Sequence, residues 1–261
     1  MNGELAQCLA IATHVTMGLA QSRGGLSRAD GLLGLPQFAD LVAFDSVVGV
    51  EAWVDRLADD GVDRLWFAVA DLGAADWPGG LPAPASAGFV GGVPIGLLGT
   101  GSAGSRLWKS QWSAGARVAD GAQILIANYV SQPRPVVPAR VGMGTASHEL
   151  DQALEKATEF AVRQQLPTWA RVFAEARRQP ARDATPRAGR PRDLFPVSWP
   201  DADGPRLADR ALAAWVFGGM GSWNDLGFAD GGVRQEYEQI SRDLLETVLR
   251  ACIAAVNIDL P

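Results

Sequence analysis

The sequence predicts an α+β fold in which a small mixed or antiparallel sheet is packed by C-terminal helices. The three segments most typical of strands, at about 64–70, 93–98 and 122–130, come before the longest helical patterns in the chain. Strands and helices that are separated in this way favour α+β over a doubly wound α/β fold, in which they alternate. The length of 261 residues fits one large domain, so we expect a single domain over 1–261.

The N-terminal half begins with a predicted buried helix over about 5–20, whose apolar residues recur at three- and four-residue steps. Residues 26–45 show no period and are expected to be irregular. A second helix is predicted from Ser46, a residue type that caps helices, to near Gly61. Residues 71–92 are rich in glycine and proline and predict a loop.

The predicted strands differ in how well the sequence defines them. The 64–70 segment is apolar on both faces, which is typical of a central strand covered on each side. The 122–130 segment is rich in isoleucine, valine and tyrosine, which favour strands. Residues 105–117 fit a helix or a strand, so the strand order stays open.

The C-terminal half predicts helices from about 145 to Pro167, then a short one up to Ala176, one over 207–217 and one over 233–256. The last of these has the strongest amphipathic pattern in the chain. Between them, an Arg- and Pro-rich excursion at about 177–206 carries no apolar period.

Charge and cysteine content exclude several classes of protein. The net charge of −6 disfavours general binding to nucleic acid or to an anionic membrane. Cys8 and Cys252 lie near opposite ends of the chain, which indicates no disulfide framework and favours a reducing cytoplasm. Of the 23 basic residues only Lys109 and Lys156 are lysines, a bias typical of GC-rich bacterial genomes. The apolar run near the N-terminus is too short to span a bilayer.

The segment Gly99-Thr-Gly101-Ser-Ala-Gly104 matches the glycine spacing of a dinucleotide-binding loop, with Asp120 at the distance of a ribose-binding acid. The bulky Trp108 that follows fits poorly with this fingerprint, so we expect a glycine-rich loop and no cofactor. Its central serine, Ser102, lacks the first glycine of a nucleophile elbow.

Few residues are candidates for histidine-dependent catalysis or for metal binding. His14 and His148 are the only histidines. His148-Glu149 begins like a two-histidine zinc helix, but Gln152 stands where the second histidine would be. We therefore expect no metal site, and we interpret the acidic residues that follow His148 as a solvated helix face.

The segment around Trp223, Asn224 and Asp225 combines glycines with tryptophans and is the leading site hypothesis. Such a loop lines a pocket in which Asn224 and Asp225 orient a ligand. The alternative is a tight turn in which Trp223 fills the core and Asp225 caps a helix.

Seven arginines fall between positions 171 and 192, among them Arg178 and Arg182. Arginine pairs with carboxylates and phosphates through a planar fork, so this segment is a candidate dock for an acidic partner, another subunit or RNA; a solvated loop is the alternative.

These observations favour a non-catalytic, cytoplasmic accessory or immunity-like protein that binds a protein partner or associates with itself through exposed loops. The chain lacks paired histidines and a convincing nucleophile, whereas its long connections suit recognition. The alternative is a small-molecule enzyme whose pocket is formed by the glycine-rich loops 99–105 and 218–225. A ligand-dependent thermal shift would support the enzyme, and a co-purifying stoichiometric partner would support the binding protein.

Overall fold

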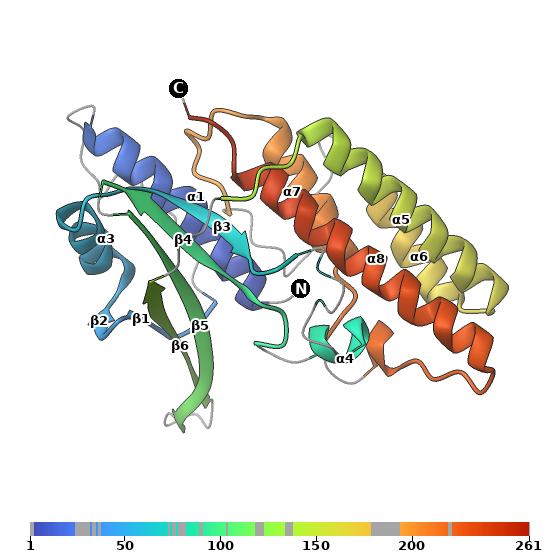
Figure 1. Ribbon diagram of the computed structural model, residues 1–261. Coiled ribbons are helices and arrows are strands. Elements are labelled where there is room, and N and C mark those ends of the chain that lie inside the picture. Colours follow the sequence, from blue (N-terminus) through green and yellow to red (C-terminus); the bar gives the residue numbers. More distant parts are fainter. Residues whose placement is uncertain are drawn as a thin grey trace.

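The computed structural model confirms the α+β fold: a six-stranded mixed sheet is packed by helices, including those of the C-terminal half (Figure 1). None of the described helices combines the length and hydropathy that a membrane span requires. The structure describes residues 3–23, 32, 35, 38–72, 74, 77, 82–88, 91–102, 104–117, 123–133, 138–178, 194–218 and 221–260.

The sheet has the strand order β2-β1-β6-β5-β4-β3, in which only β1 and β6 run parallel and all other neighbours are antiparallel. The strands are β1 (Leu41–Phe44), β2 (Val47–Val48), β3 (Val62–Val69), β4 (Ile95–Gly101), β5 (Gly104–Arg117) and β6 (Gln123–Pro133). The three predicted strands correspond to β3, β4 and β6, but β3, which was expected to be a central strand, lies at the edge of the sheet.

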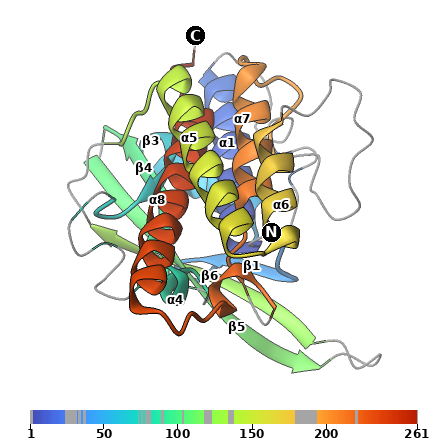
Figure 2. The same ribbon diagram turned by 90° about the vertical axis from the view of Figure 1, so that its right-hand side faces the viewer.

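The helices lie on one side of the sheet and extend into a bundle (Figures 1 and 2). They are α1 (Gly3–Arg23), α3 (Val50–Asp59), α4 (Ala83–Ala87), α5 (Met143–Arg163), α6 (Pro167–Arg177), α7 (Asp203–Ala214), the 3-10 helix η1 (Trp223–Asp225) and α8 (Gly231–Val256).

Several local predictions were wrong or incomplete. The segment 105–117 is a strand, and β1 lies within the stretch expected to be irregular; its four residues are too few to show an alternating pattern. The second helix begins at Val50 instead of following Ser46, because Asp45 and Ser46 have φ of 45° and 76° and form the two-residue turn between β1 and β2. The short helix α4 lies inside the predicted loop.

Helix α1 runs through the middle of the molecule, between the sheet and the bundle (Figure 1). Its polar side chains Gln7, Thr13 and His14 are as buried as its apolar ones, because a central helix has no solvent face. The hydroxyl of Thr16 donates to the carbonyl of Leu65 in β3 at 2.7 Å, which ties α1 to the sheet.

The outer edge of β3 is covered by side chains instead of a further strand. The Asn257 side chain, just after α8, accepts a hydrogen bond from the Phe67 N–H at 2.9 Å and donates one to the Phe67 carbonyl at 2.8 Å. The Leu65 N–H donates to the Thr16 hydroxyl at 3.2 Å. These contacts satisfy backbone groups that an open edge would present to another chain.

Side chains also bond to the backbone of β6 beyond both ends of its short partner strand β1. The Leu125 N–H donates to the Asp40 carboxylate at 2.7 Å, and the Ser131 N–H donates to the Asp45 carboxylate at 2.7 Å. The other Asp45 oxygen accepts from the Trp108 indole N–H at 2.9 Å. The two aspartates that flank β1 therefore continue the hydrogen bonding where the strand itself ends.

Candidate partner-binding surface

The predicted glycine-rich loop is a tight hairpin between β4 and β5. A Cβ on Gly101 would lie 2.0 Å from the carbonyl oxygen of Gly61, and one on Gly99 would lie 2.7 Å from the ring of Trp108. Ser102 lies in the turn, where its N–H donates to the Gly61 carbonyl at 3.1 Å. A strand follows Gly104, so the helix N-terminus of a dinucleotide fingerprint is missing. Packing therefore explains these glycines, and Asp120 lies outside the described residues.

Trp223 of η1 has no exposed surface. Its indole N–H donates to the Ser241 hydroxyl at 2.8 Å, and its carbonyl accepts from the Tyr237 hydroxyl at 2.7 Å. Four aromatic rings contact its indole at centroid distances of 5.0 to 6.1 Å, and we call them with Trp223 the aromatic cluster: Phe160, Trp169, Phe173 and Tyr237. The arrangement favours the role of Trp223 as a core residue of the helical bundle.

Asn224 and Asp225 are directed to their own segment. The Asn224 carbonyl oxygen accepts from the Gly218 N–H at 2.9 Å, and the Asp225 carboxylate accepts from the Gly221 N–H at 2.5 Å. Both contacts close the turn, although Asp225 is exposed. Asn224 also lies against Gly88 at the end of α4, whereas the 99–102 hairpin lies against Gly61. The described parts of the two glycine-rich loops therefore have different neighbours.

The tyrosine in the aromatic cluster is not poised for acid–base chemistry. Burial raises the pKa of Tyr237, a hydrogen bond with Ser241 opposes the increase, and the negative charge of Asp225 adds to it. The hydroxyl is therefore neutral near pH 7, as its role as donor to the Trp223 carbonyl requires.

Arg178 is exposed immediately after α6, where it is available to solvent or to a partner. Arg182 lies outside the described residues. The role of both as a dock for an acidic partner stays a prediction.

The acidic face of α5 is occupied by ion pairs. Glu149 accepts two hydrogen bonds from Arg250 of α8, at 2.8 and 3.3 Å, and Glu155 pairs with Arg177 of α6 at 3.0 Å. His148 is exposed and its Nε2 lies 3.1 Å from the Gln152 amide nitrogen. No group of residues with metal-ligating geometry occurs in the described part of the chain.

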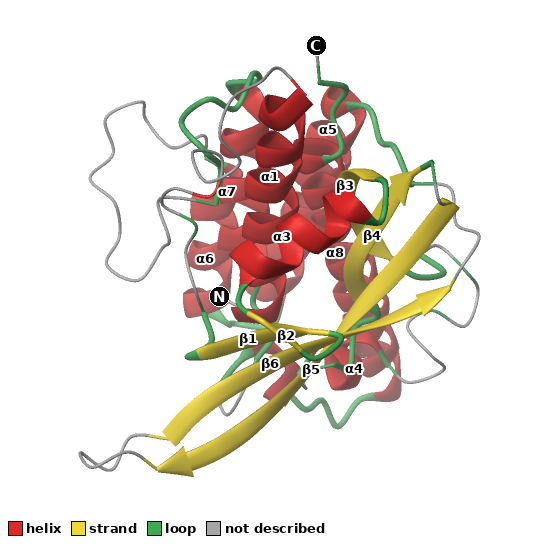
Figure 3. Cartoon of the chain, turned by 90° about the vertical axis from the view of Figure 1, so that its left-hand side faces the viewer, coloured by secondary structure: helices red, strands yellow, loops and turns green. Residues whose placement is uncertain are grey.

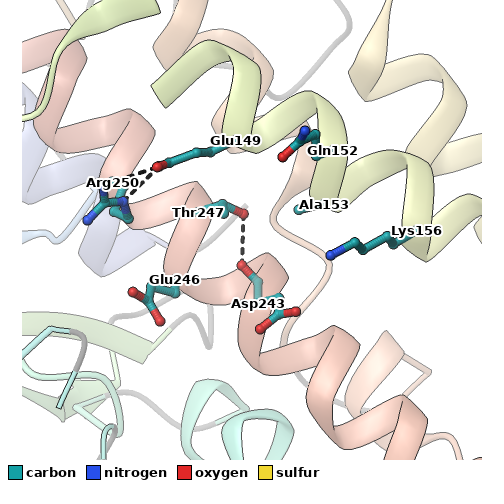
Figure 4. A pocket seen from close by; sticks show the side chains of 8 residues that line it. All are labelled: Glu149, Gln152, Ala153, Lys156, Asp243, Glu246, Thr247 and Arg250. Carbon is teal, nitrogen blue, oxygen red and sulfur yellow. Dashed lines mark hydrogen bonds and ion pairs between the residues drawn. The ribbon is translucent and has the colours of Figure 1, made fainter. Parts of the chain in front are cut away.

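A polar groove of about 280 Å³ runs between α5 and α8 (Figure 4). Lys156 extends across it from α5, and Asp243 and Glu246 face it from α8. The Arg250 guanidinium in this groove is held by Glu149, which also raises its pKa. The Glu149–Arg250 pair therefore joins the two helices electrostatically across the groove.

The cysteines are free thiols in the core. Burial raises the pKa of Cys252 to about 12 and that of Cys8 still further, with the charge of Glu4 contributing to the second. Because the thiolate is the reactive form, neither cysteine is activated as a nucleophile.

The two faces of the sheet differ around β1 and β6, whereas on β3 to β5 the outer face also has a small buried cluster of Trp66, Leu98 and Leu107. On the inner face, Val42 and Phe44 of β1 and Tyr129 of β6 are buried against α1 and α3; the Phe44 ring stacks on Trp53 of α3 at 3.7 Å. Side chains alternate along a strand, so the intervening residues form the outer face. There Leu41 is 38 % exposed and Val48 is 62 % exposed.

The exposed apolar surface continues into the distal part of the β5–β6 pair, which projects beyond the helices (Figures 2 and 3). We call residues 112–117 and 123–126 the ribbon. Its apolar side chains Ile124, Leu125 and Ile126 point alternately to the two faces, and Leu125 is 46 % exposed while both isoleucines are partly exposed. A strand with apolar residues on both faces is typical of a sheet that is covered on both sides.

The sequence pattern predicts this strand but not the surface that the strand forms. The sequence does contain a signal for it, because three consecutive aliphatic residues indicate a strand with protein packed against both faces. Periodicity does not reveal whether that cover comes from the same chain, and here the helices end before they reach the ribbon (Figure 3).

No protein family, curated protein or solved structure matches this chain. The geometry of its own residues is therefore the basis for a functional proposal.

Proposed function

We propose that this chain is a non-catalytic, cytoplasmic accessory or immunity-like protein, and that its protein partner docks on the ribbon and on the adjoining outer face of the sheet. The observation that carries the proposal is the run of Ile124, Leu125 and Ile126, which is apolar on both faces, with Leu125 exposed on one and the two isoleucines partly exposed on the other. Exposed apolar surface that extends over neighbouring strands is typical of interaction sites, whereas single exposed apolar residues are ordinary.

The surface is continuous across the sheet. Leu41 pairs with Ile126 across the β1–β6 ladder, and Val48 pairs with Ala43 across β1–β2, so these side chains share the outer face. Polar residues such as Asn128 and Gln111 lie beside them in the same register. An apolar centre with a polar surround is the usual composition of a protein interface.

The remaining chemistry supports binding over catalysis. Both thiols are buried, three acids of α5 (Glu149, Asp151 and Glu155) are ion-paired, and packing explains Gly99 and Gly101 of the β4–β5 hairpin. Two free cysteines also support a reducing compartment.

The proposal is tested by capture of a stoichiometric complex from the native host with two matched variants. Ile124→Thr/Ile126→Thr keeps β-branched residues in the strand but removes apolar surface, and we expect it to lose the complex. Val162→Thr is the control, because Val162 is 64 % exposed on α5, outside the sheet. Capture of the same complex by both variants would contradict the proposal.

Light scattering of the purified chain distinguishes the kind of partner. We expect a monomer, whose ribbon amides become protected from hydrogen exchange only when the partner is added. A dimer that dissociates in the Ile124→Thr/Ile126→Thr variant would instead show that the partner is a second copy.

A further inference from the structure

The backbone of β6 shows which edge of the ribbon is already occupied. The carbonyl of Leu125 accepts a hydrogen bond from the Asp40 N–H at 2.9 Å. The carbonyl of Tyr129 accepts one from the Asp45 N–H, also at 2.9 Å. Backbone groups of successive residues in a strand point to opposite sides, so these odd-numbered residues of β6 face β1. Ile126, which lies between them, therefore directs its N–H and carbonyl to β5.

The opposite edge of the ribbon, along β5, is open. Ser113 lies directly opposite Ile126 in the β5–β6 ladder, so its backbone bonds to β6. Trp112 and Ala114 are the alternate residues, and their N–H and carbonyl groups point away from β6. Strand β4 pairs with β5 only up to Trp108, and no described strand runs along the ribbon part of β5 on that side. This edge therefore presents backbone donors and acceptors that another chain can pair with.

The other edges of the sheet are covered by side chains or are short. Asn257 and Thr16 bond to the backbone of β3, and Asp40 and Asp45 bond to β6 beyond the ends of β1. Strand β2, at the far end of the sheet, has only two residues. Proteins cover or shorten their edge strands because an open edge pairs with other chains. The ribbon edge of β5 departs from this pattern, as it projects beyond the helices (Figure 3).

The charges beside this edge favour an acidic segment. The described residues of β5 and β6 include no aspartate or glutamate. Arg106 pairs with Asp60 at 3.8 Å, whereas Lys109 and Arg117 have no ion-pair partner among the described residues. These two cations lie on either side of Trp112 and Ala114 in β5. A second copy of the chain would bring the same two positive charges to the edge, whereas carboxylates placed opposite them would be favourable.

We propose that the partner docks through an extended, acidic segment of its polypeptide chain, which joins the sheet as an additional strand along β5. The main chain of this segment bonds to the N–H and carbonyl groups of Trp112 and Ala114, and its carboxylates pair with Lys109 and Arg117. In strand addition, main-chain hydrogen bonds supply affinity and alternate side chains supply specificity. This mode of docking rests on the proposed function, in which the ribbon binds a protein, and adds the chemistry of the partner's segment.

Calorimetric titration of the full chain with matched peptides tests the requirement for acidic groups. The acidic probe is acetyl-Glu-Thr-Val-Thr-Val-Thr-Val-Thr-Glu amide, which has the length of the stretch from Lys109 to Arg117. Its counterpart has lysine in place of both glutamates. We expect the acidic peptide to bind at least about tenfold more tightly, because it pairs with two charges that its counterpart meets with repulsion. Equal affinities, or no binding of the acidic peptide at millimolar concentration, would overturn the proposal.

Backbone N-methylation of the acidic peptide tests strand addition itself. In an antiparallel alignment with its glutamates at Lys109 and Arg117, the two central threonines lie opposite Trp112 and Ala114. Methylation of these threonines removes the donors that face β5 and should abolish binding, whereas the N–H groups of the first and last valines point away and their methylation is the matched control. Weaker binding of the valine-methylated peptide instead would indicate a parallel strand. Equal affinity of the two methylated peptides would refute pairing through the main chain.

Substitutions in β5 link the binding to this edge. Lys109→Glu/Arg117→Glu should reverse the preference, so that the lysine peptide binds more tightly than the acidic one. Lys156→Glu/Arg171→Glu is the matched control, since these residues are exposed on α5 and α6. Thermal unfolding checks that both variants fold. An unchanged preference in the β5 variant would place the peptide elsewhere and refute the site.

The peptides also separate this docking mode from the proposed function. If Ile124→Thr/Ile126→Thr loses the native complex but the chain shows no preference for the acidic peptide, strand addition is overturned and the proposed function stands. If the native complex persists in that variant, the proposed function fails even where the acidic peptide binds to β5. A dimer whose Trp112 and Ala114 amides are protected from hydrogen exchange without peptide would show that a second copy supplies the strand, and would overturn the acidic partner.

Discussion

Trp223 in the bundle and Leu125 in the ribbon are both large apolar residues on well-formed elements, yet one has no exposed surface and the other is 46 % exposed. Around Trp223, the helices α5, α6 and α8 supply four aromatic rings and two hydrogen-bond partners. Around Leu125, the described contacts are the pairing with Ala114 of β5 and the hydrogen bonds that its N–H and carbonyl form with Asp40. Within the described part of the chain, Trp223 is therefore fully covered, whereas the ribbon has the composition of a buried strand and leaves Leu125 exposed.

The largest expected effect follows from truncation in the aromatic cluster. Trp223→Ala should lower the free energy of unfolding by about 3–5 kcal/mol, because it removes a buried ring and leaves a cavity. Trp223→Phe should cost less, since it keeps most of the packing and loses the hydrogen bond to Ser241. Denaturant unfolding gives both values. A folded Trp223→Ala variant of normal stability would show that the residue serves a pocket and would break the comparison.

A smaller loss of unfolding free energy is expected for substitutions of Asn257, where the end of α8 meets β3. Asn257→Ala should cost about 1–3 kcal/mol, because the N–H and carbonyl of Phe67 lose their partner at a buried position. Asn257→Asp separates the two bonds, since a carboxylate accepts from the N–H but cannot donate to the carbonyl. If both variants unfold at the denaturant concentration of the native chain, the edge contacts of β3 do not contribute to stability.

The stability of the chain at acid pH tests the contacts that Asp45, at the end of β1, makes with β5 and β6. Partial burial would raise the pKa of Asp45, but hydrogen bonds from Ser131 and Trp108 and the charge of Arg106 outweigh it and lower the pKa. A lowered pKa in the folded state means that the stabilisation is present above the unfolded value of 3.8 and is lost as the pH falls through the folded pKa.

The expected result is that the difference in unfolding free energy between the native chain and Asp45→Asn shrinks as the pH falls below about 4. Glu4 acts in the opposite direction, because burial raises its pKa despite hydrogen bonds from Ser110 and Gly91. The comparison of the two chains cancels that contribution. A difference that stays constant from neutral to acid pH would mean that Asp45 does not hold the strands through its charge.

The smallest effect is expected in the ribbon. Ile124→Thr/Ile126→Thr should change the free energy of unfolding by about 1 kcal/mol or less, because both side chains are already partly exposed. Chemical denaturation measures this change. A loss as large as that of Trp223→Ala would show that the isoleucines belong to the core of this chain and would remove the contrast with the bundle.

Sequence reasoning predicted the fold class and the strands β3, β4 and β6 because each has a long or strongly apolar pattern. It missed β1, which has only four residues and is held in the sheet by Asp40 and Asp45. It could not decide on β5, in which Trp108 and Trp112 fit either period. Tertiary contacts decide such segments, and they are not visible in a local pattern.

The roles of the candidate site residues also depend on tertiary contacts that a local sequence pattern does not show. The spacing of Gly99 and Gly101 is that of a nucleotide loop, but the close approach of Gly61 and Trp108 explains the missing side chains. The sequence leaves two roles open for Trp223, a residue that lines a pocket or a residue that fills the core. The aromatic rings around it in the structure favour the core role. The surface around Ile126 was missed because exposure depends on where the helices end.

The central position of α1 has a consequence for the order in which the fold forms. Its Thr16 hydroxyl bonds to Leu65 of β3, 49 residues away in the sequence, whereas its Thr13 hydroxyl bonds to the carbonyl of Leu194, 181 residues away. Contacts over long sequence separations are slower to form than local ones. We therefore expect α1 to pair with β3 before its contact at Leu194 is made.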